Sequence, residues 1–130
     1  MGTDQSFLGD VTSALYDFLA RELPRFERTD WWNHYVLSVL TPPQREIIER
    51  RRVTSLSGLD LAALLRVLDQ NWNEMSTKLK WPREIRTFVK ESQSIRNRWA
   101  HSGSQPPMAD DIYRDFDTLQ RLMQAIGDAG

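Results

Sequence analysis

The stretch SIRNRWAHSG, at positions 94–103, places an arginine, an asparagine and a histidine at a spacing that could act on a phosphate. A guanidinium binds phosphate oxygens through paired N–H donors and stays charged at any physiological pH. An imidazole titrates close to neutrality, so it can take or give the proton of a hydroxyl. Arg96, Asn97 and His101 could therefore cleave RNA without a metal, because the 2′-OH of the RNA can itself attack the adjacent phosphate.

The positions of these residues on a helix bear on the same question. At about 100° per residue, Arg96 falls on the side that carries the apolar residues Ile85, Val89 and Trp99. Arginines rarely face inward unless they are paired or bind a ligand. Asn97 lies four residues before the histidine, on the edge of the helix where an amide can orient an imidazole.

A purely structural role would explain the same residues. Arg96 could pair with a buried aspartate such as Asp60 or Asp115, and His101 could help to end the helix, where a cation suits the helix dipole. Judged by spacing alone, this structural role is the favoured interpretation, since short motifs recur by chance.

The elements that would position these residues are helical throughout. Apolar residues recur at steps of three and four within residues 7–23, 31–39, 61–79, 85–99 and 112–126. Proline and glycine interrupt the pattern at Pro24, at 41–43, at Pro82 and at 102–107. No stretch alternates with a period of two for long enough to predict a strand. The sequence therefore predicts an all-α fold, a bundle of four long helices with one or two short ones.

Composition limits the kind of protein. A chain of 130 residues can bury a core of its own, so we predict a single domain over residues 1–130. Its end at AIGDAG, directly after an apolar helix pattern, suggests a fragment of a larger multidomain protein. No apolar run is long enough for a membrane span. With no cysteine and two histidines, we predict no metal and no cofactor, and a cytoplasmic location.

Charge is distributed unevenly, although the net charge is only −1. Residues 78–98 carry seven basic and two acidic side chains, a net +5, whereas residues 110–128 carry two basic and five acidic ones, a net −3. One interpretation is an RNA path that leads to the motif, with Arg86, Lys90 and Arg98 as contacts to the RNA backbone. The other is that the basic and acidic helices pair with each other inside the bundle.

The order of motifs resembles the HEPN superfamily, whose signature is an arginine, four to six residues and a histidine, often with asparagine after the arginine. The resemblance rests on LSGLDLAALLRVLDQNW (residues 56–72), IRNRWAH (95–101) and DDIYRDFDTLQRLM (110–123), and extends from Trp31 to Met123. It is strongest to the branch that includes the HEPN domain of a yeast nuclear mRNA-surveillance endonuclease. The resemblance implies that Arg96 contacts the scissile phosphate, Asn97 orients and polarises, and His101 acts as general acid or base.

The resemblance also implies partners. It implies a homodimer in which two such helices face each other and line one cleft, and an endoribonuclease that needs no metal and leaves a cyclic phosphate. Bacterial relatives are commonly fused to ATPases, helicases and other phage-defence proteins. We therefore expect an RNA-cleaving effector domain of a larger phage-defence or RNA-surveillance protein. The alternative is a non-catalytic HEPN module that dimerises, binds RNA or regulates a fused ATPase or helicase.

Overall fold

The computed structural model describes residues 3–100 and 109–128, and these form helices and connecting turns without a strand. The all-α prediction is confirmed. In chain order the elements are α1 (Thr3–Phe26), the π-helix η1 (Trp32–Val36), the 3-10 helix η2 (Leu37–Val39), α2 (Pro42–Arg50), the 3-10 helix η3 (Leu56–Gly58), α3 (Leu61–Gln70), α4 (Trp72–Leu79), α5 (Glu84–Ala100) and α6 (Ala109–Asp128).

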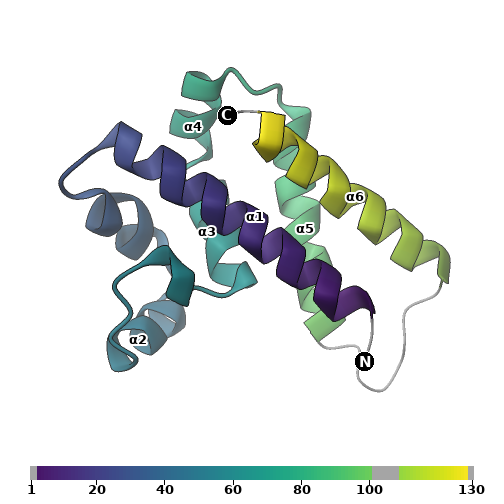
Figure 1. Ribbon diagram of the computed structural model, residues 1–130, viewed down its shortest axis with the longest axis horizontal. Helices are drawn as coiled ribbons and strands as arrows, with labels where there is room; N and C mark the ends of the chain where they lie inside the picture. Colours follow the sequence, from purple (N-terminus) through teal and green to yellow (C-terminus); the bar gives the residue numbers. More distant parts are fainter. Residues whose placement is uncertain (1–2, 101–108, 129–130) are drawn as a thin grey trace.

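The long helices pack around one apolar core. Figure 1 shows α1 and α6 running side by side, with α3 and α5 behind them and α2 at one edge of the molecule. α5 packs against both α3 and α6, so it is the central helix of the bundle and fixes the position of the candidate site. Each helix contributes fully buried side chains at spacings of three and four, among them Leu15, Leu19, Leu64, Leu68, Val89, Leu119 and Leu122.

The continuous pattern over residues 61–79 is divided between two helices. Asn71 separates α3 from α4 and adopts φ −98° and ψ 14°. Its side-chain amide donates to the carbonyl of Val67 and to the carbonyl of Tyr35, both at 2.8 Å. An asparagine side chain that bonds to backbone groups competes with regular helix. The apolar period continues across the break, because Trp72 and Met75 remain buried.

Two helix N-termini are fixed by side chains that also lie near the end of α5. Thr41 and Gln44 form a capping box at the start of α2, in which each side chain bonds to the backbone N–H of the other. Asp60 caps α3 by accepting from the N–H of Ala63 at 2.9 Å. These caps set where α2 and α3 begin, and so which of their residues face α5.

No helix in the part of the chain that the structure describes is long and apolar enough to cross a membrane.

Candidate functional site

Arg96 and Asn97 lie together in the last turns of α5. The Arg96 guanidinium donates through Nη1 to Oδ1 of Asn97 at 3.4 Å. Its Nη2 lies 3.8 Å from Oδ2 of Asp60, too far for a hydrogen bond, and that carboxylate is 66% exposed. An exposed ion pair of this kind contributes little to the stability of the fold, so another anion can readily replace the carboxylate beside Arg96. The Arg96 side chain, itself 31% exposed, is thus oriented by its neighbours and still open to a ligand.

The third residue of the predicted site, His101, directly follows the end of α5 at Ala100 and lies outside the described residues. Its position relative to Arg96 and Asn97 therefore stays a prediction from the spacing.

Polar side chains of three helices surround a hollow beside Arg96 and Asn97. The hollow has a volume of about 270 Å³ and is lined by these two residues with Gln93 of α5, Arg66 of α3, and Thr41 and Gln44 at the start of α2. Sequence reasoning missed Arg66. The available signal was a single basic residue within the strongly apolar helix LAALLRVLDQ, since such a residue needs a partner or a ligand.

Arg98 takes part in a different arrangement, on the side of α5 that faces α6. Its Nη2 donates to Oδ1 of Asp115 at 2.7 Å, and Nε1 of Trp99 donates to Oδ2 of the same carboxylate at 2.9 Å. Asp115 is only 3% exposed, so this pairing compensates a buried charge. Of the two aspartates predicted as buried partners of Arg96, Asp115 therefore binds Arg98 instead, whereas Asp60 lies 3.8 Å from Arg96 but is exposed.

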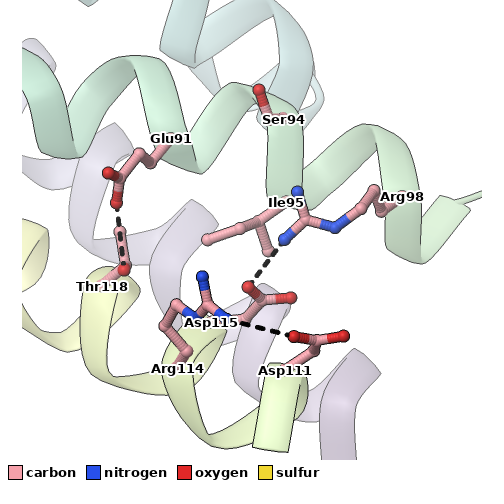
Figure 2. A pocket seen from close by; sticks show the side chains of 8 residues that line it. All are labelled: Glu91, Ser94, Ile95, Arg98, Asp111, Arg114, Asp115 and Thr118. Atoms are coloured by element: carbon pink, nitrogen blue, oxygen red, sulfur yellow. Dashed lines mark hydrogen bonds and ion pairs between the residues drawn. The ribbon is translucent and has the colours of Figure 1, made fainter. Parts of the chain in front are cut away.

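A hollow of about 400 Å³ lies between α5 and α6 next to this pair (Figure 2). Its charged side chains bind one another: besides the Arg98 contact, Arg114 lies 3.3 Å from Asp111, and the Thr118 hydroxyl donates to Glu91 at 3.3 Å. Three carboxylates line this hollow, so it is poorly suited to an anionic ligand.

Arg86 and Lys90, the other predicted RNA contacts, share a buried partner in α3. Nζ of Lys90 lies 2.8 Å from Oδ2 of Asp69, and Nε of Arg86 lies 3.5 Å from Oδ1 of the same residue. Both cations remain about half exposed and line a hollow of about 500 Å³ together with Arg83. At about 100° per residue, Arg86 and Lys90 lie within about 40° of each other on α5, and Asn97 falls between them.

Metal-binding clusters and groups with a shifted pKa are the other features that could carry chemistry in the described residues. No set of three or more histidine, cysteine, aspartate or glutamate residues in residues 3–100 and 109–128 is close enough together to hold a metal ion. A hydrogen bond to Glu74, together with burial, raises the pKa of Tyr35 to about 12. Tyr35 belongs to η1 and does not line the hollow beside Arg96.

The comparison with known families decides the assignment. A family model described as Swt1-like HEPN matches residues 7–127. The chain belongs to the Swt1-like HEPN family. Swt1 is the yeast mRNA-surveillance endonuclease, so the predicted resemblance is confirmed, and the match also includes most of α1, which the resemblance did not cover. No curated protein and no solved structure matches the chain. HEPN domains act on RNA and often dimerise, so membership of the family supports an RNA-related role, as a nuclease or as an RNA-binding module.

Proposed function

We propose that this HEPN domain is a metal-independent endoribonuclease whose site consists of Arg96, Asn97 and His101, placed at a cleft between two copies of the chain. The observation that carries the proposal is the state of Arg96. Its guanidinium is hydrogen-bonded to Asn97, and its nearest carboxylate among the described residues is the exposed one of Asp60, 3.8 Å away. A charge kept in place but not neutralised by a buried partner is suited to a phosphate.

The proposed reaction uses the RNA's own nucleophile. The 2′-OH attacks the adjacent phosphorus while the bond from phosphorus to the 5′-oxygen breaks, which leaves a 2′,3′-cyclic phosphate and a 5′-OH. Arg96 stabilises the charge that develops on the phosphate oxygens. His101 acts as the general base toward the 2′-OH or as the general acid toward the leaving 5′-oxygen, and Asn97 orients it.

The dimer supplies both proton-transfer steps within one cleft. Two copies bring two His101 imidazoles to the same phosphate, so one can accept a proton while the other donates one. After the reaction, the imidazole that accepted a proton is protonated and the imidazole that donated one is neutral. The two imidazoles have thus exchanged protonation states.

RNA would reach this site along α5. Arg86 and Lys90 lie on the face of α5 that also carries Asn97, and each keeps about half of its side chain exposed while it pairs with Asp69. They support a path for the phosphate backbone toward the motif. Arg98 would contact the backbone from another face, with the part of its guanidinium that Asp115 does not occupy. Within a longer protein, such a domain would serve as the effector in RNA surveillance or phage defence.

The class of reaction is tested by incubating the chain with a labelled mixed-sequence RNA, and with DNA of the same sequence, in excess EDTA. We expect the RNA to be cut, the DNA to stay intact, and the RNA fragments to end in a 2′,3′-cyclic phosphate. Loss of cutting in EDTA, or equal cutting of DNA, would contradict the mechanism. Binding of RNA without cutting would favour the alternative, a non-catalytic module that dimerises or regulates a fused ATPase or helicase.

A further inference from the structure

We propose that the hollow between α2, α3 and α5 is a second phosphate-binding subsite, in which Arg66 binds a backbone phosphate of single-stranded RNA next to the phosphate held by Arg96. This inference rests on the proposed function, because it assigns the neighbouring stretch of the same substrate. Arg96 and Asn97 line the hollow, so a strand bound at the motif would continue into it.

Arg66 is the residue that distinguishes this hollow. It lies half buried on α3, and its Nε donates to the backbone carbonyl of Val39. Among the described residues, Arg86, Arg96 and Arg98 each have a carboxylate oxygen within 4.0 Å, whereas Arg66 has none. A guanidinium stays charged even when it is half buried, so Arg66 holds a positive charge with no carboxylate of the described residues within 4.0 Å. Its two Nη groups remain available as donors, in a fork geometry that matches two oxygens of a phosphate.

The amides that line the hollow also present donors. The amide oxygen of Gln44 accepts from the N–H of Thr41 at 3.0 Å, so the NH₂ group of Gln44 is left as a donor. The amide oxygen of Asn97 accepts from Arg96 in the same way, which leaves its NH₂ group as a donor. No carboxylate of the described residues lines the hollow, and the nearest one to Arg96, that of Asp60, lies 3.8 Å away, so an anion in the hollow meets two guanidinium groups and several N–H donors.

Two other hollows among the described residues suit an anion less well. Carboxylates of Glu91, Asp111 and Asp115 line the hollow between α5 and α6. In the hollow beside Trp72, Arg83 has no carboxylate within 4.0 Å among the described residues, but Arg86 and Lys90 are both paired with Asp69, and the carboxylate of Glu91 also lines the hollow. Of these three hollows, the one at Arg66 therefore fits a phosphate group best.

Binding of a 2′-O-methyl RNA oligonucleotide tests the subsite, because this RNA cannot be cut and its affinity is read independently of catalysis. We expect Arg66→Gln to weaken binding about tenfold, as loss of one charge-assisted contact does. The slope of log affinity against log salt should also become shallower by about 0.7, the value for one phosphate contact on a single strand. The matched control is Arg121→Gln, which removes one exposed arginine on α6 and should leave both quantities unchanged. Equal affinities for the two variants would overturn the subsite.

A second variant separates the loss of RNA contacts from a folding defect. It is needed because Arg66→Gln also removes the hydrogen bond from Arg66 to the Val39 carbonyl. Gln93→Glu adds a negative charge to the lining of the hollow without touching that bond, and Gln124→Glu makes the same change on α6. We expect Gln93→Glu to weaken binding severalfold more than Gln124→Glu does. If Gln93→Glu and Gln124→Glu bind alike, the subsite is wrong. Cleavage of unmodified RNA by the same proteins reports on the proposed nuclease separately, so either proposal can fail alone.

Discussion

Arg96 and Arg98 are two positions apart on α5 and have contrasting surroundings. Arg96 is 3.8 Å from an exposed carboxylate, whereas Arg98 is 2.7 Å from the buried carboxylate of Asp115. When one partner of such a pair is removed, a buried charge is left uncompensated, and this destabilises the fold far more than loss of a surface pair. Stability and activity should therefore separate at these two residues.

Alanine substitution at the two arginines should give opposite results. We expect Arg98→Ala to lower the free energy of unfolding by about 1–3 kcal/mol, because Asp115 then keeps only the bond from Trp99. Arg96→Ala should change it by less than about 1 kcal/mol and abolish RNA cleavage. Urea unfolding of both variants, followed by circular dichroism, measures the difference. Equal destabilisation would show that Arg96 is a structural residue.

At the scale of the elements, η1 is attached to the junction of α3 and α4 by two contacts. The side chain of Asn71 donates to the carbonyl of Tyr35, and the phenol of Tyr35 is hydrogen-bonded to Glu74 of α4. Together these contacts fix the segment that leads into α2, and so the position of Gln44 in the hollow.

Replacing Asn71 by alanine should therefore weaken the fold. The change removes a bond between segments 36 residues apart in the sequence and leaves the Tyr35 carbonyl without that donor. We expect Asn71→Ala to lower the free energy of unfolding by about 1–3 kcal/mol. Asn73→Ala, at an exposed position of α4, should lower it by less than about 0.5 kcal/mol. A urea titration in which the two variants unfold at the same concentration would contradict this role.

The contact between Tyr35 and Glu74 predicts that the fold becomes less stable at strongly alkaline pH. The folded pKa of about 12 lies above the ordinary value of 10, so the neutral phenol is favoured by folding. Its stabilising contribution is complete below pH 10 and is lost as the pH rises toward 12. An ultraviolet titration of tyrosinate should show a step near pH 12 that is absent in Tyr35→Phe and moves to lower pH in Glu74→Gln. A step unchanged in Glu74→Gln would rule out the contact as its cause.

Local patterns predicted the helices well and their long-range partners poorly. The break at Asn71 was missed because the apolar spacing continues through it, and its cause is a carbonyl far upstream in the sequence. Likewise, the sequence placed Arg96 and Asn97 together on one helix, but helix spacing could not show that Arg98 would bind Asp115. Arg66 was overlooked because its importance depends on the cap of α2, which only the folded chain brings next to it.

At the scale of the whole molecule, buried carboxylates offset much of the positive charge of α5. Asp69 pairs with Arg86 and Lys90, and Asp115 pairs with Arg98. Arg96 and Arg66 line the same hollow, and neither has a buried carboxylate within 4.0 Å among the described residues. We propose that recognition of RNA is local to their shared hollow rather than a property of the overall charge.

The most direct test of the account compares the two histidines in one assay, the cutting of labelled RNA in excess EDTA. His34 is the matched control, since it lies in η1, is 60% exposed and contacts Glu27 at 2.7 Å. We expect His101→Ala to reduce the cleavage rate by about 100-fold or more, as loss of a general acid or base does, and His34→Ala to cut like the wild type. Cutting by His101→Ala at the wild-type rate would show that the nuclease site is not at Arg96, Asn97 and His101.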